Sequence, residues 1–87
     1  MTKKIDLIST LGNFSIVHLN ERAFPGVLIQ GDTLQSLRVL LKKISLSGEI
    51  GDESLIELNE QLETIESVMR QYESDCLRLF GRIPYSP

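Results

Sequence analysis

The sequence predicts an α+β fold: a three-stranded antiparallel sheet packed against a helical hairpin with one long C-terminal helix. Before Asp32, apolar and polar residues alternate in short runs, which is typical of strands. After Asp32, apolar residues recur every three or four positions, which is typical of helices. The chain has 87 residues, a length that favours a single domain over residues 1–87.

Three short strands are expected within residues 3–30. Residues 4–9 alternate weakly and form the first candidate, and residues 14–19 form the second. A bend at Pro25-Gly26 leads into the third, the apolar run 27–29, because proline fixes φ and glycine tolerates unusual dihedral angles. The short links between the runs favour an antiparallel meander.

The first helix is predicted over residues 33–46, with Asp32 capping its first free N–H groups. Its apolar stripe consists of Leu34, Leu37, Leu41 and Ile44, widened by Leu40. The cations of this segment, Arg38, Lys42 and Lys43, fall outside the stripe.

The second helix, predicted over residues 53–80, has the strongest pattern. Its seam repeats in alternating steps of three and four: Leu55, Leu58, Leu62, Ile65, Met69, Tyr72, Cys76 and Leu79. A helix of this length measures roughly 40 Å, about twice the first helix. The excess seam must therefore contact the sheet, the tail 81–87 with its apolar anchors Ile83 and Tyr85, or another chain.

This excess predicts a homodimer, or a monomer that dimerises weakly, through the long helix. We expect the contact in its C-terminal half, near Met69, Tyr72 and Cys76.

Composition excludes several partners. The net charge of −3 argues against nucleic-acid binding, which needs excess positive charge. No apolar run approaches the roughly 20 residues of a membrane span, and no signal peptide is visible. One cysteine excludes an internal disulfide and indicates the cytoplasm.

Catalytic chemistry has no recognisable basis in this sequence. His18 is the only histidine and lies in a candidate strand, and Cys76 occupies a seam position typical of a small core residue. One histidine and one cysteine do not make a recognisable zinc site, and no phosphate-binding glycine motif is present. We expect no enzyme, no metal and no cofactor.

The charge pattern is more informative. From Glu49 to Glu66 there are seven acids and no lysine or arginine. Glu53, Glu57, Glu60 and Glu63 project away from the seam, and Ile56 lies on the same flank. This acidic flank is either a solvated face, partly paired with cations of the first helix, or a docking stripe for a basic partner with Ile56 as apolar anchor.

The run Arg22-Ala23-Phe24-Pro25-Gly26, a short apolar strand and then Gln30-Gly31-Asp32-Thr33-Leu34 resembles a family of small uncharacterised bacterial proteins. Its members also resemble this chain in a long final helix and an apolar-Pro-Tyr tail, here Ile83-Pro84-Tyr85. The resemblance implies a stand-alone bacterial domain and no transferable activity. Gln30 and Asp32 form either a structural turn or a ligand contact.

The leading hypothesis is an immunity or antitoxin-type inhibitor that neutralises a cognate bacterial toxin, such as a nuclease, by occluding a basic surface. Small size, acidity and the lack of catalytic residues favour it. The alternatives are a homodimeric structural or adaptor module, and a small-molecule-binding domain around Gln30 and His18.

Overall fold

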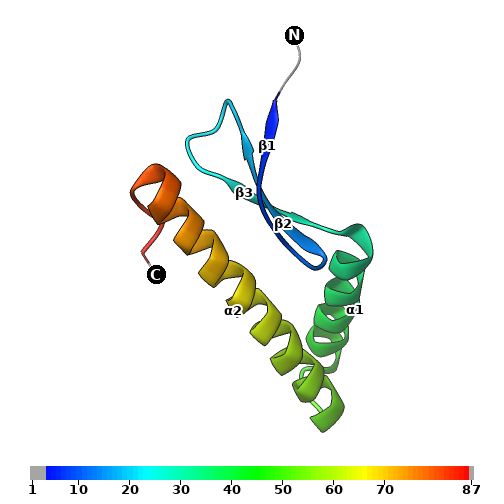
Figure 1. Ribbon diagram of the computed structural model, residues 1–87. Coiled ribbons are helices and arrows are strands. Elements are labelled where there is room, and N and C mark those ends of the chain that lie inside the picture. The colour runs from blue at the N-terminus through cyan, green and yellow to red at the C-terminus, as the bar shows by residue number, and fades with distance from the viewer. Residues whose placement is uncertain (1–3, 87) are drawn as a thin grey trace.

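Three strands precede two helices in the computed structural model, which describes residues 4–86 (Figure 1). They are β1 (Ile5–Leu11), β2 (Phe14–Leu19), β3 (Gly26–Ile29), α1 (Gly31–Ser47) and α2 (Asp52–Phe80). The predicted α+β fold, with its antiparallel sheet and long second helix, is confirmed. The first strand continues two residues beyond the expected end, to Leu11, while Lys3 lies outside the described residues.

The sheet has the strand order β1-β2-β3, and both pairs are antiparallel. The pairing of β1 with β2 shifts between Leu7 and Ser9, so that Ser9 pairs with Ile16. Directly paired residues of an antiparallel sheet share a face, and Ile16 is fully buried. This irregularity therefore turns Ser9 towards the interior, where regular alternation from Leu7 would have turned it outward.

The core lies between the sheet and the C-terminal half of α2. Ile16, Tyr72 and Cys76 are buried at its centre, and five partly buried side chains pack around them: Ile8, Leu11, Val27, Met69 and Ile83. The Tyr72 hydroxyl donates to the carbonyl oxygen of Pro25 at 2.8 Å, which ties α2 to the bend before β3.

The C-terminal tail folds back onto α2, as the sequence indicated. Ile83 packs against the core, and the Tyr85 ring stacks on Tyr72 with 6.4 Å between ring centroids. The Tyr85 hydroxyl also donates to the Glu73 carboxylate at 3.0 Å.

Both helices begin earlier than predicted, so Asp32 does not cap the first of them as expected. The N-cap residues are Gln30 and Gly51, and neither makes a side-chain capping bond. Asp32 and Asp52 instead lie in the first turns, where negative charge suits the helix dipole. The extended backbone at Gln30 and Gly51 explains the correction, because helical geometry starts at the following residue.

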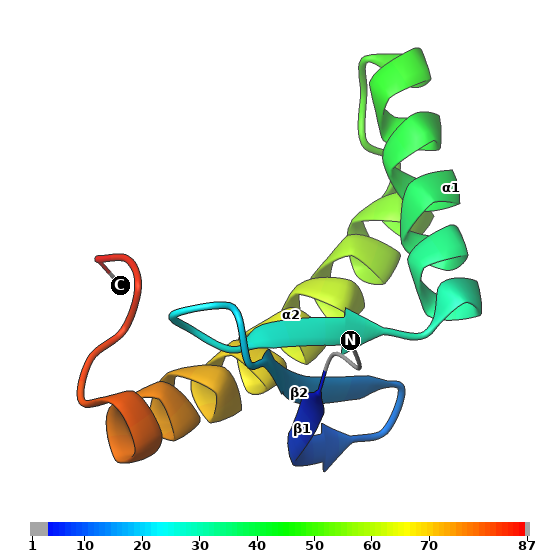
Figure 2. The ribbon, with the colours of Figure 1, turned by 90° about the horizontal axis from the view of Figure 1, so that it is seen from above.

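The two helices meet at the turn after Ser47 and diverge away from it (Figures 1 and 2). The radius of gyration is 15.6 Å, compared with about 12 Å for a compact chain of this length. Tyr72 and Cys76 are buried, whereas Leu62 is 50 % exposed. Tyr72 and Cys76, near which contact with a second chain was expected, are therefore covered by the chain's own sheet and tail, while Leu79 at the end of the seam is 48 % exposed.

Candidate functional site

The acidic flank lies on exposed surface of α2. Glu53, Glu57, Glu60 and Glu63 are all exposed, and Ile56 between them is 59 % exposed. At about 100° per residue, Ile56 and three of the glutamates turn away from the direction in which Tyr72 and Cys76 enter the core. Glu57 shares the direction of the buried Asp75, and it is exposed because the core lies against the C-terminal half of α2. The flank therefore presents carboxylates around one apolar side chain, with its backbone held rigidly by a long helix.

These carboxylates are not neutralised by α1. Across residues 4–86 the structure shows no ion pair between α1 and α2, and Arg38 donates instead to Gln35 on its own helix. The negative potential of the flank is thus left to solvent or to a partner.

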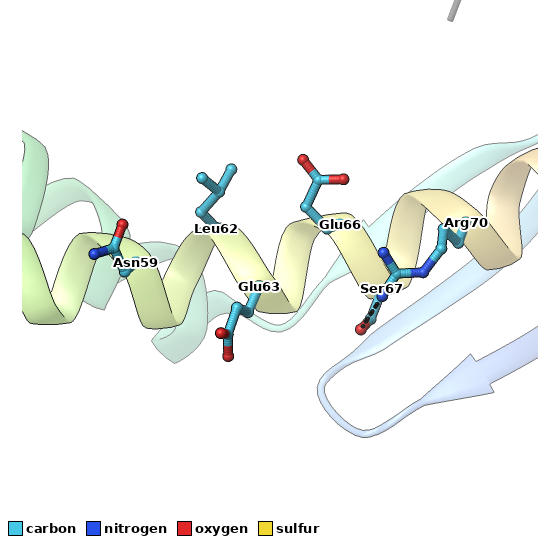
Figure 3. A pocket seen from close by; sticks show the side chains of 6 residues that line it. All are labelled: Asn59, Leu62, Glu63, Glu66, Ser67 and Arg70. Atoms are coloured by element: carbon cyan, nitrogen blue, oxygen red, sulfur yellow. Dashed lines mark hydrogen bonds between the residues drawn. The ribbon is translucent and has the colours of Figure 1, made fainter.

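A second group of α2 side chains lies beside the acidic flank and lines a shallow depression (Figure 3). It consists of Asn59, Leu62, Glu63, Glu66, Ser67 and Arg70. Leu62 and Glu66 project to the same side, and Arg70 donates to the Ser67 hydroxyl at 3.2 Å. Glu63 therefore borders both this depression and the acidic flank.

The Gln30 turn is built mainly by its backbone. The Gln30 N–H donates to the Asn13 carbonyl at 3.0 Å, and its own carbonyl accepts from the N–H of Leu34 at 3.1 Å. The Asp32 carboxylate accepts from the N–H of Thr33 at 2.8 Å. These bonds join the end of the sheet to the start of α1, which is the structural role considered for this turn.

Sequence reasoning missed the polar centre of the molecule, Asp75, which is only 1 % exposed. Its carboxylate accepts from the Ser9 hydroxyl at 2.8 Å, and from Gln71 and Arg78 at 3.0 Å each. Burial pushes the pKa of Asp75 upward, but these three donors outweigh it and hold the pKa below its usual value. The only feature of the sequence that pointed to a buried Asp75 was its position directly before the seam residue Cys76.

His18 and Cys76 have structural environments. The His18 Nε2 lies 2.7 Å from the Arg22 carbonyl oxygen, and its ring meets Phe80 edge-on at 4.9 Å. Cys76 is fully buried, and this burial raises the pKa of its thiol. A protonated, buried thiol is a poor nucleophile.

Within residues 4–86, no cluster of three or more histidine, cysteine or acidic residues could hold a metal ion. In the same range, no helix is both long enough and apolar enough to cross a membrane.

Comparison with known proteins places the chain by family. None of the curated proteins and none of the solved structures matches it. One family model does, that of a family of unknown function, and its match extends over residues 1–85. Because this match covers nearly the whole chain, the protein belongs to the family of unknown function DUF6959.

Proposed function

We propose that this protein is a non-catalytic inhibitor of the immunity or antitoxin type, which neutralises a bacterial toxin by covering a basic surface. The observation that carries the proposal is the acidic flank of α2. Its four glutamates are exposed and have no ion pair with α1 within the described chain. Ile56, 59 % exposed, sits among them.

Charge and apolar contact have separate roles in this proposal. Nucleases bind polyanionic substrates, so their clefts are basic, and an acidic surface is attracted to them over long range. Charge complementarity speeds association, whereas an apolar side chain that becomes desolvated at the centre of the contact slows dissociation. Glu57 and Glu60 would serve the first purpose and Ile56 the second.

The remaining side chains support a binding role over a catalytic one. The Cys76 thiol is buried, His18 packs against Phe80, and Asp75 is occupied by three donors. None of these groups lies exposed beside a nucleophile and a base, as acid–base or covalent catalysis requires. A bacterial, cytoplasmic setting belongs to the same proposal, since an immunity protein meets its toxin inside the producing cell.

The experiment is co-expression with the product of the gene immediately upstream, followed by affinity purification. The wild-type chain is expected to retain that product and suppress its toxicity. Reversing two acids, in Glu57→Lys/Glu60→Lys, should weaken binding about a hundredfold or more at low salt, because positive charge then meets positive charge. Ile56→Asp should weaken binding through loss of apolar contact.

A matched control variant, Asp6→Lys/Glu49→Lys, changes the net charge by the same amount away from the acidic flank. Both of its acids are exposed, Asp6 on β1 and Glu49 in the turn before α2. It should bind like the wild type apart from a small general effect of charge. Failure to co-purify would contradict the inhibitor proposal. Equal binding by the flank and control variants would remove the acidic flank from recognition.

A further inference from the structure

A row of leucines is left uncovered along one edge of the helical pair. Leu34 and Leu41 of α1 are each 50 % exposed, and Leu55 and Leu62 of α2 are 44 % and 50 % exposed. We call these four residues the apolar edge. Exposed leucine is common when scattered, but an aligned row on two neighbouring helices is typical of an interaction surface.

Helical geometry places the two halves of this row on the same side of the molecule. On α1, Leu34 and Leu41 are rotated by about 80° from the inward direction marked by Leu37 and Leu40. On α2, Leu55 and Leu62 are rotated by about 50° in the same sense from the inward direction of Leu58. Since the helices run in opposite directions from their shared turn, rotations in the same sense bring both pairs to one side.

We propose that a second copy of this chain covers the apolar edge, forming a symmetric homodimer. The first argument is surface area. A compact monomer of 9.8 kDa exposes about 5,200 Å², whereas this chain exposes 6613 Å². The excess of about 1,400 Å² exceeds the roughly 800 Å² that each partner buries in a standard stable interface.

The second argument is that the edge is complementary to itself in charge. On α1, a depression along the edge is lined by Leu34, Leu37, Leu41 and Ser45 together with two cations, Arg38 and Lys42. On α2, the depression around Leu62 is lined by two acids, Glu63 and Glu66 (Figure 3). One cation, Arg70, lines it as well and donates to the Ser67 hydroxyl, so acids outnumber cations there by two to one.

In a dimer with twofold symmetry, these charges are complementary in one arrangement, with α1 of each chain against α2 of the other. Placing α1 of one chain on α2 of the other brings cations to acids twice, once for each symmetry-related contact. Packing α1 on α1 would instead oppose cations to cations. A partner unrelated to this chain would need no such internal match, so the match favours a second copy.

This inference does not rest on the proposed function. Glu53, Ile56, Glu57 and Glu60 turn away from the apolar edge and stay accessible in the dimer. Glu63 borders both surfaces, so the two outcomes are separated by variants that touch only one of them: Leu41→Glu and Leu62→Glu for the dimer, Glu57→Lys/Glu60→Lys for inhibitor binding.

The first test is the mass of the full chain in solution, measured by light scattering after size exclusion at micromolar concentration. The wild type should have a mass of about 20 kDa, twice the 9.8 kDa of one chain. Leu41→Glu and Leu62→Glu should each weaken dimerisation about tenfold or more, because a charge would be buried against leucine.

Two control substitutions introduce the same charge at exposed apolar positions off the edge. Leu46→Glu lies on α1 at a position 86 % exposed, and Leu28→Glu lies on the sheet at a position 60 % exposed. Both should leave the mass unchanged. A monomeric wild type, or dissociation by the controls but not by the edge variants, would overturn the proposal.

The second test asks which helix meets which. The variants Arg38→Glu/Lys42→Glu and Glu63→Lys/Glu66→Lys each place like charges at both contacts, so each alone should dimerise about tenfold more weakly or worse. Mixed together, they restore opposite charges at both contacts and should form a heterodimer, visible by native mass spectrometry. Single variants that dimerise like the wild type, or a mixture that stays monomeric, would contradict the pairing of α1 with α2.

Discussion

Asp75 is a buried polar residue whose hydrogen bonds connect α2 to the sheet. A buried carboxylate is costly unless its oxygens accept hydrogen bonds, and here three donors reach it from β1 and α2. The Ser9 bond depends on the shifted pairing after Leu7, which turns that serine inward. Arg78 is 59 % exposed, so its ion pair adds less than the hydrogen bonds of the more enclosed Ser9.

The first prediction is that Asp75→Asn lowers the free energy of unfolding by about 1–3 kcal/mol at pH 7. The folded-state pKa of Asp75 lies below its unfolded value, so the ionised form stabilises the fold above the unfolded pKa, near 4. That contribution disappears as the pH falls through the folded pKa. Urea titrations should therefore show the gap between wild type and variant narrowing from pH 7 to pH 2. A constant gap would mean that the carboxylate charge is not the stabilising feature.

At the scale of single elements, the hydrophobic periodicity of the sequence predicted the strands and helices well, but it did not predict how they pack against one another. Alternation identified the first two strands and the three-four repeat identified the two helices, because these periods follow from backbone geometry. The third strand was identified by a short apolar run after the bend at Pro25-Gly26. The seam of α2 is equally regular along its length, so its pattern holds no information on which half the sheet covers. The shifted pairing at Ser9 and the inward turn of Asp75 are likewise products of tertiary contact.

For the candidate site, the sequence likewise predicted which side chains are exposed but not which ion pairs they form. Exposure of the acidic flank followed from its position relative to the seam, and the structure agrees at all five residues. Pairing of these acids with Arg38, Lys42 or Lys43 depended on the angle between the helices, which the sequence does not encode locally. Within residues 4–86 the structure shows no ion pair between the two charge sets.

The second prediction contrasts two positions on α2. Val68 lies outside the predicted seam but is 4 % exposed, and Val68→Ala should cost about 2 kcal/mol through lost burial. Leu62→Ala, at a half-exposed seam position, should cost less than about 1 kcal/mol when measured at high dilution. Urea denaturation of both variants is the measurement. The reverse ranking would mean that the sheet contacts the N-terminal half of α2.

At the scale of the whole molecule, one chain covers only part of its own apolar surface. The long helix predicted that a partner would be needed, but the expected location, near Tyr72 and Cys76, lies inside the fold. The apolar edge lies on α1 and the first half of α2, while the sheet and tail cover Tyr72 and Cys76 in the second half. The central claim is therefore that a second copy of the chain covers this helical pair.

Hydrogen–deuterium exchange at two protein concentrations tests this claim most directly. Protection should rise with concentration in α1 and in residues 52–66, because dimerisation stabilises the segments it buries. Protection of residues 68–80, already packed on the sheet, should change much less. Protection that is independent of concentration throughout the chain, or a rise confined to the strands, would contradict the account.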